Sequence, residues 1–126
     1  MIQQQTVLKV SDNSGAKTVK CIKVLNGFKK KHAKLGDYVI VSVQQLRSKF
    51  KTNSKVKKGE VYRALIIRSK IGRVKKDYIK TVFDENSVIL VNKQLIPIGT
   101  RIIGPLPKFF KKKKFQKFIS ISFGVV

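Results

Sequence analysis

The sequence is short of the residues that build catalytic and metal sites. Its 126 residues include a single cysteine, Cys21, and a single histidine, His32. A structural zinc site usually takes four cysteine or histidine ligands, and a cysteine–histidine nucleophile pair would use both residues here. One cysteine also excludes a disulfide within the chain. The glycine-rich phosphate-binding motifs of nucleotide enzymes are absent too. We therefore expect no enzyme, no metal and no cofactor.

Acidic residues are scarce. Six Asp and Glu residues stand against 29 Lys and Arg residues, which gives a formal net charge of +23. Because carboxylates are so few, most basic side chains cannot be paired within the chain. The acidic residues mostly fall in expected turns, which favours turn stabilisation over acid–base catalysis. They are Asp12, Asp37, Glu60, Asp77, Asp84 and Glu85.

Long hydrophobic runs are missing. No segment approaches the roughly 20 apolar residues of a transmembrane helix. Residues 1–6 lack both an apolar signal core and an Arg-rich amphipathic presequence. We therefore expect no membrane partner, and a protein that is made where it works or imported by other means. The hydrophobic content of 42% is ordinary, so one domain over residues 1–126 can bury a core.

The excess of positive charge indicates a polyanionic partner. A compact domain with a net charge of +23 repels itself unless a polyanion neutralises it, and nucleic acid is the commonest such partner. Only five of the 29 basic residues are arginine. Lysine acts as a point charge on phosphate, whereas arginine is preferred for bidentate recognition. Lysine, isoleucine, phenylalanine and asparagine also have A/T-rich codons, so the composition indicates an A/T-rich genome.

Short alternating runs predict strands rather than long helices. The expected strands span residues 6–10, 17–25, 36–43, 59–68 and 86–92. In the second of them, Cys21 faces a core as a small buried hydrophobe, while Lys17, Lys20 and Lys23 face outward. The segment 68–80 is expected to form a basic hairpin or loop. Five closely spaced strands predict a mainly β fold, a small five-stranded closed β-barrel.

The chain changes character after Pro105. Phe115, Phe118 and Ile119 fall on one helical face, which predicts a short helical extension over residues 105–126, packed on the barrel. Ile119, Ile121 and Phe123 also alternate as they would in a strand. The pattern leaves both alternatives open.

Three clusters of basic residues are the positive signal for function. They span residues 29–34, residues 47–58 with a return at 70–76, and residues 108–117. Lysines on loops that project from a rigid barrel can follow the irregular phosphate surface of folded RNA. The phenylalanines of the third cluster could stack on bases, but their spacing favours packing on the barrel. Membrane binding is disfavoured because the charge also occupies the barrel loops, and no DNA-binding motif is visible.

Six segments carry recognisable motifs in a fixed order: residues 1–6, 10–16, 21–25, 36–37, 56–60 and 97–105. Together they resemble the universal ribosomal protein family number fourteen of the large subunit, over essentially the whole chain. The resemblance implies a structural constituent of that subunit, bound to large-subunit rRNA. Family members sit at the subunit interface, help form bridges to small-subunit rRNA, and pack beside ribosomal proteins three and nineteen. They also dock a ribosome-silencing factor that blocks subunit joining.

The resemblance also suggests site residues. Matching the docking region of the silencing factor points to Thr100, Arg101 and Lys117. The candidates for RNA contact lie on expected strands and loops, and a merely solvated surface is the alternative for each of them. They are Lys17, Lys23, Lys30, Lys31, Lys49, Lys57, Arg68, Lys70 and Arg73.

The sequence departs from the family pattern in three places. Tyr78 stands where the family usually has glycine. Because tyrosine disfavours positive φ, the sequence leaves undecided whether the tight turn of the family forms there. Segment 46–54 is longer than in bacterial relatives and segment 108–114 is more basic, so both could meet altered RNA or new protein neighbours. The A/T-rich composition, the bacterial-type motifs and the lack of a presequence predict an organelle-encoded protein of a mitochondrial ribosome. A bacterium with an A/T-rich genome is the alternative.

Overall fold

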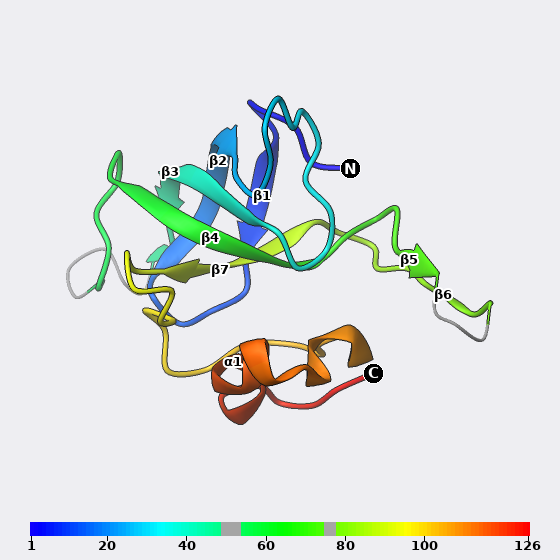
Figure 1. Cartoon of the computed structure of the whole chain (residues 1–126). Helices are drawn as coiled ribbons and strands as arrows, with labels where there is room; N and C mark the ends of the chain where they lie inside the picture. The colour runs from blue at the N-terminus through cyan, green and yellow to red at the C-terminus, as the bar shows by residue number, and fades with distance from the viewer. Residues whose placement is uncertain (49–53, 75–77) are drawn as a thin grey trace.

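Five strands form a closed barrel, as the alternating sequence predicts (Figure 1). The computed structural model describes residues 1–48, 54–74 and 78–126. Neighbouring barrel strands are antiparallel except for β1 and β7, which pair in parallel. The strands are β1 (Val7–Val10), β2 (Ala16–Val24), β3 (Tyr38–Leu46), β4 (Val61–Arg68) and β7 (Ser87–Val91). Strand β3 runs beyond its predicted end at residue 43, because Leu46 still pairs with Ala16 of β2.

Strand β2 shows how its lysines come to face outward. Lys17 and Lys23 are exposed and Lys20 is half-buried, whereas Val19 and Cys21 are fully buried. Strict alternation could not place Lys17, Lys20 and Lys23 on one face, because residues three apart in a regular strand lie on opposite faces. The register with β3 shifts near Lys17 and again between Cys21 and Lys23, which keeps the apolar residues inside. Cys21 is fully buried in the barrel core, which confirms this residue as a small buried hydrophobe, and the burial raises the pKa of its thiol.

The apolar side chains form two layers. One layer fills the barrel, and the other lies between the outer face of β4 and β7 and the C-terminal segment. In β7, Val88 and Leu90 belong to the barrel interior, while Ile89 and Val91 belong to the outer layer; all four are fully buried. A strand buried on both faces has a continuous apolar run rather than an alternating one. Residues 88–91 show that run because the C-terminal segment covers them.

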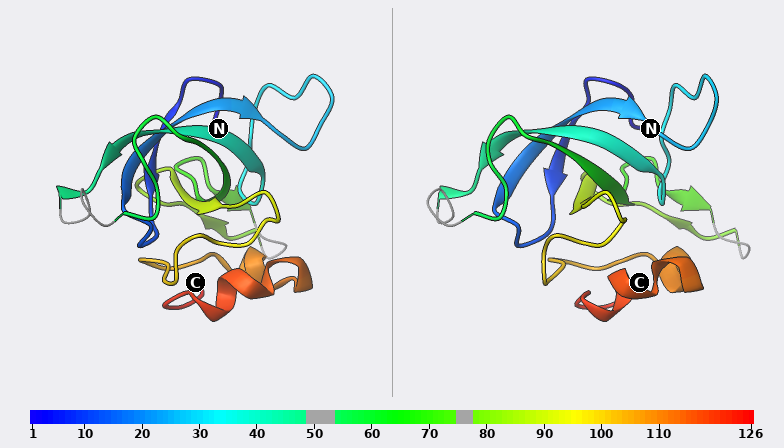
Figure 2. Two further views of the ribbon diagram at one scale, coloured as in Figure 1. Left: turned by 90° about the vertical axis from the view of Figure 1, so that its left-hand side faces the viewer. Right: turned by 60° about the vertical axis from the view of Figure 1, so that its left-hand side comes forward.

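The C-terminal segment lies across the barrel as a series of short helical turns (Figure 2). These turns are η2 (Lys108–Lys111), η3 (Lys113–Phe115) and α1 (Gln116–Ser120). The helical alternative is confirmed, whereas Ile119, Ile121 and Phe123 form no strand: Ile119 lies in α1, and after the helix only Ser122 and Val125 form isolated parallel bridges, with Ile102 and Leu106. Within the described ranges, no helix is long and apolar enough to cross a membrane.

A two-stranded hairpin projects beyond the barrel (Figure 1). It pairs β5 (Arg73–Val74) with β6 (Lys80–Thr81) in antiparallel orientation, which confirms the predicted basic hairpin. Tyr78 has a φ of 59°, so the backbone keeps a left-handed conformation although tyrosine stands in place of glycine. Asp77 lies outside the described residues.

Candidate nucleic-acid interface

Several acidic side chains accept hydrogen bonds within the fold. Few carboxylates are therefore available to pair with the many basic side chains. Asp12 is fully buried. One of its oxygens accepts the Ser14 N–H at 2.9 Å, and the other accepts the Leu90 N–H of β7 at 2.9 Å. Asp37 accepts a hydrogen bond from Lys30 Nζ at 2.6 Å. These contacts confirm the predicted role of such carboxylates in turns and corners.

Glu60 is held in the same way at the turn before β4. It accepts hydrogen bonds from the Tyr62 hydroxyl and from the Lys57 backbone N–H at 3.1 Å. The bond from Tyr62 lowers the pKa of the Glu60 carboxyl, while burial and the same bond raise the pKa of Tyr62 to about 12. Among the described residues two ion pairs are present, Lys9–Glu85 and Lys30–Asp37. Apart from Lys9 and Lys30, no described basic residue forms an ion pair, and the net charge of +23 is spread over unpaired side chains.

The loop between β2 and β3, residues 25–37, brings one set of predicted lysines together. Lys23, Lys30 and Lys31 line a hollow of about 780 Å³ together with Lys29 and two glutamines near the N-terminus. Of the residues that the structure describes around this hollow, none is acidic. Lysine ammonium groups around an open concavity favour the binding of an anionic chain.

Other predicted contacts lie elsewhere on the barrel. Lys17, at the opposite end of β2, lines a smaller hollow of about 380 Å³ with Lys58. Lys57 and Lys70 are exposed on loops. The structure thus spreads the candidates around the barrel instead of gathering them into one patch. Four lysines of the predicted second cluster lie outside the described residues, namely Lys49, Lys51, Lys75 and Lys76.

Arg68 is the predicted RNA contact that the structure places in the interior. It is 8% exposed, and its guanidinium group donates hydrogen bonds to Ser11 Oγ and, at 3.0 Å, to the Ile103 carbonyl. Gly104 has a φ of 87° and lies so close that a Cβ atom there would collide with the guanidinium group. Burial lowers the pKa of Arg68. The side chain ties β4 to the 102–104 turn, so we leave it out of the proposed RNA surface.

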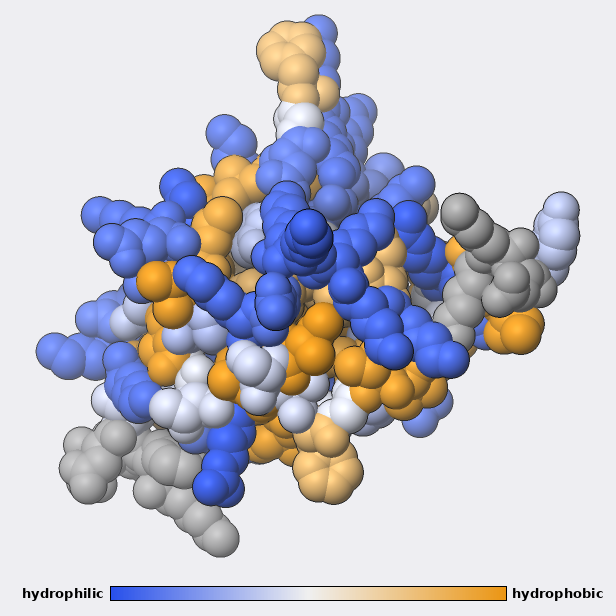
Figure 3. Space-filling model, turned by 60° about the horizontal axis from the view of Figure 1, so that its bottom comes forward, coloured by the Kyte–Doolittle hydropathy of each residue, from blue (hydrophilic) through white to orange (hydrophobic). Residues whose placement is uncertain are grey.

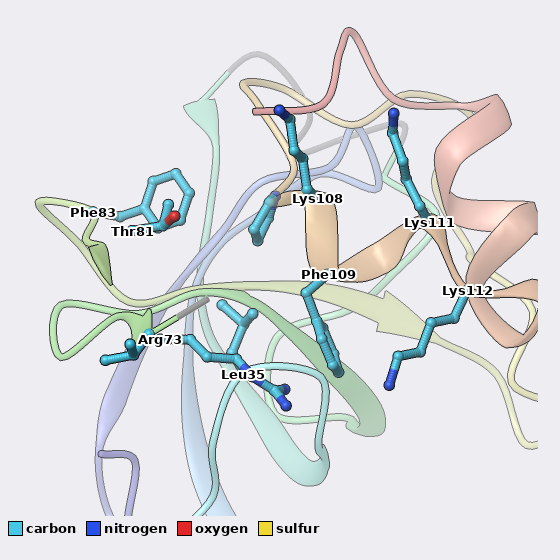
Figure 4. A pocket seen from close by; sticks show the side chains of 10 residues that line it. Leu35, Arg73, Thr81, Phe83, Lys108, Phe109, Lys111 and Lys112 are labelled. Carbon is cyan, nitrogen blue, oxygen red and sulfur yellow. The ribbon is translucent and has the colours of Figure 1, made fainter. Parts of the chain in front are cut away.

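Arg73 and the C-terminal lysines meet around one aromatic ring. The guanidinium carbon of Arg73 lies 4.0 Å from the ring centroid of Phe109, and Lys112 Nζ lies 4.7 Å from it. The ring borders an apolar groove of about 500 Å³ that Lys108 and Lys111 also line (Figure 4). This contact between the hairpin and the C-terminal segment was not predicted from the sequence, because no residue spacing relates two segments so far apart in the chain.

The other phenylalanines of the third cluster face the barrel. Phe110 and Phe115 are buried in the outer apolar layer, together with Phe118, which follows the cluster. The prediction that these rings pack on the barrel rather than stack on bases is therefore confirmed. The lysines between them are exposed, and hydrophilic side chains extend over this side of the molecule around smaller hydrophobic areas (Figure 3).

Comparison with known protein families gives a match over residues 1–126 to the family described as ribosomal protein L14p/L23e. The chain belongs to this family. Its members are structural proteins of the large ribosomal subunit and not enzymes, so the chain has rRNA and ribosomal partners in general. The resemblance seen in the sequence is confirmed. In the part of the chain that the structure describes, no three His, Cys, Asp or Glu residues are grouped as a metal ion would require.

The predicted silencing-factor residues of this L14p/L23e chain lie on two segments that the fold joins. Asn13 Oδ1 accepts the backbone N–H groups of Thr100 at 2.7 Å and Arg101 at 3.2 Å, and Asn13 Nδ2 donates to Thr100 Oγ1 at 2.7 Å. The next residue, Ile102, donates its N–H to the carbonyl that follows α1, the helix of Lys117. The sequence placed Asn13 within the motif over residues 10–16 and predicted no contact for it. The turn residues around Asn13 were the one sequence signal for these hydrogen bonds to Thr100 and Arg101, which we call the Asn13 clamp.

Proposed function

We propose that this L14p/L23e chain binds large-subunit rRNA, sits at the subunit interface and helps form bridges to small-subunit rRNA. The observation that carries RNA binding is the uncompensated charge of +23 on a folded barrel. Phosphate contacts by lysine release condensed counterions, and this supplies most of the affinity of such interfaces. The barrel holds the lysines at fixed separations, so RNA segments can pack against it without repelling each other.

The proposed RNA contacts surround the barrel rather than form one patch. Lys23, Lys30 and Lys31 line the β2–β3 hollow, whereas Lys17 lies at the other end of the same strand. An arrangement of this kind suits several RNA segments that converge on one protein. The remaining proposed contacts are Lys57, Lys70 and Arg73 and, outside the described residues, Lys49.

The family resemblance supports two further sets of partners, ribosomal proteins three and nineteen and a ribosome-silencing factor. For the factor we propose a docking face of Thr100, Arg101 and Lys117. The Asn13 clamp supports this proposal, because it fixes the backbone that presents the first two side chains. Arg101→Glu is expected to weaken factor binding in a pull-down with purified subunits, whereas Lys113→Glu on η3 leaves it unchanged. Equal retention of both variants would contradict the docking face.

For the compartment we propose a mitochondrial ribosome with an organelle-encoded subunit. The support is the prevalence of amino acids with A/T-rich codons: lysine predominates, and arginine accounts for only five of the 29 basic residues. Sequencing of DNA from purified organelles tests it: recovery of the coding sequence there is the expected result. Recovery only from an A/T-rich bacterial genome would refute the mitochondrial assignment and leave the ribosomal role intact.

Sedimentation of tagged protein from a native lysate tests the main proposal. Fractions are washed at rising salt and the bound RNA is sequenced. The expected result is migration with the large subunit through high salt, with large-subunit rRNA recovered. Release at low salt with mixed RNA, or recovery with lipid, would contradict specific rRNA binding. A Cys21→Ser variant that remains folded should behave as the parent, because this buried side chain makes no surface contact.

A further inference from the structure

The β2–β3 loop exposes an aromatic ring almost completely. Phe28 is 92% exposed, and among the described phenylalanines only Phe123, at 93%, is comparable. The ring has a lysine close by, with Lys29 Nζ at 5.5 Å from its centroid. An isolated exposed apolar side chain needs no explanation on its own. The surroundings of Phe28 supply the second observation.

The loop that carries Phe28 is tied at its base by hydrogen bonds to Asp37. Asn26 and Lys29 have φ values of 69° and 50°, so left-handed residues flank the tip on both sides. At the base of the loop, Lys30 Nζ and the Lys34 N–H both donate to one oxygen of Asp37, at 2.6 and 2.8 Å. The loop over residues 25–37 stands out from the barrel (Figure 2), and the exposed ring of Phe28 belongs to it.

A basic hollow lies directly beside the tip. Gly27, next to Phe28, lines the hollow of about 780 Å³ with four lysines and two glutamines. The cores of protein–protein interfaces are depleted in lysine, so this setting does not resemble a protein-docking site. A single-stranded nucleic acid needs this combination, since its phosphates bind cations and each of its bases can stack on an aromatic face.

We propose that Phe28 is a stacking platform for an unpaired RNA base whose adjoining phosphates are bound by Lys23, Lys29 and Lys31. This inference rests on the proposed RNA binding and adds the kind of RNA feature that the loop recognises. Base stacking is nearly independent of sequence, so the platform selects an unpaired nucleotide rather than a particular base. In the interior of a paired helix each base is stacked on both faces, so none is available to Phe28.

The chain contains no tryptophan, which makes a direct test possible. Phe28→Trp places a single fluorophore at the tip, and Phe123→Trp is the matched control at an equally exposed position. Each variant is titrated with a short adenosine oligonucleotide, with a long RNA duplex in which end base pairs are a small minority, and with large-subunit rRNA. We expect the oligonucleotide and the rRNA to quench the indole fluorescence of Phe28→Trp and the duplex to leave it unchanged. None of the three should quench the fluorescence of Phe123→Trp to the same degree.

Affinity supplies an independent readout. Phe28→Ala is expected to weaken binding of the oligonucleotide roughly 5- to 150-fold, which is the range for loss of one stacked base. The salt slope of binding should stay the same, because no charge is lost, and Phe28→Tyr should restore the affinity. Normal affinity in Phe28→Ala together with unquenched fluorescence in Phe28→Trp would overturn the platform and leave rRNA binding intact. Failure of the parent protein to bind rRNA at all would overturn both proposals.

Discussion

Two segments of this chain combine lysine and phenylalanine, yet the fold treats their rings in opposite ways. In the β2–β3 loop, Phe28 is almost fully exposed beside Lys29. Over residues 108–118 of the C-terminal segment, Phe110, Phe115 and Phe118 are buried and Phe109 is half-buried, whereas the lysines are exposed. Composition alone would assign the same role to both segments.

The difference lies in the apolar surface within reach. The C-terminal rings cover outward-facing side chains of β4 and β7, including Leu65 and Ile89, which would otherwise be exposed. Fully burying a large apolar side chain contributes about 1.5–3 kcal/mol. The β2–β3 loop stands beyond the end of its strands, and its base is fixed by polar contacts to Asp37. An aromatic residue in a lysine-rich segment is therefore a core residue only where a complementary apolar face is present.

The sharpest test of this difference is a pair of alanine substitutions. Phe110→Ala should lower the free energy of unfolding by about 3–5 kcal/mol, because it empties a fully buried site in the outer layer. Phe28→Ala should change it by less than about 0.5 kcal/mol, as for most surface substitutions. Urea unfolding of both variants without RNA measures the two values. Similar losses at the two positions would break the comparison.

Gly36 marks the place where the two segments meet. It has a φ of 87°, and a Cβ atom built there would lie 2.5 Å from Cε1 of Phe109. Gly59 has a φ of 86° with nothing within 4 Å of the same position, so it isolates the backbone cost. Gly59→Ala should destabilise the protein by about 1–2 kcal/mol. Gly36→Ala should cost about 1–3 kcal/mol more, because the ring must also move. Equal losses in thermal unfolding would show that the contact with Phe109 is unimportant.

Much of the barrel could be predicted because its signals are local. Alternating runs with turn residues between them identified all five strands, and Lys17 and Lys23 of β2 were correctly placed outward, while Lys20 is half-buried. The end of the chain was ambiguous for a physical reason. Its helix has a single turn, and the residues after it pair as isolated bridges with Ile102 and Leu106. Neither periodicity persists long enough to dominate such a segment.

The candidate site was less predictable because it depends on tertiary packing. Arg68 looks like other basic residues at the end of a strand, and only the fold shows its hydrogen bonds to Ser11 and Ile103. The placement of Arg73 over Phe109 likewise joins two distant segments. Charge in the sequence indicates the class of partner, but it cannot separate a lysine or arginine on the surface from one bound inside.

Charge should behave alike in the two segments even though their rings differ. Lys29→Gln with Lys31→Gln in the loop, and Lys111→Gln with Lys113→Gln in the C-terminal segment, each remove two exposed or partly exposed cations. For every lysine that contacts phosphate, the slope of log affinity against log salt should fall by about 0.7–0.9. Filter binding of large-subunit rRNA over a salt series measures the slopes. A slope that one double variant leaves unchanged would exclude that segment from the RNA interface.

The smallest expected effect concerns the cations that lie over the two rings. Arg73→Gln and Lys112→Gln should each cost about 0.5–1 kcal/mol, because these cations lie 4.0 and 4.7 Å from the centroid of the half-buried Phe109 ring. Lys29→Gln should cost nothing measurable without RNA, because water surrounds the Phe28 ring and the cation lies 5.5 Å away. Denaturant unfolding of the three variants tests this order. A stability loss at Lys29 as large as at Arg73 would mean that the loop ring is held against the protein, and it could not then be free to stack on a base.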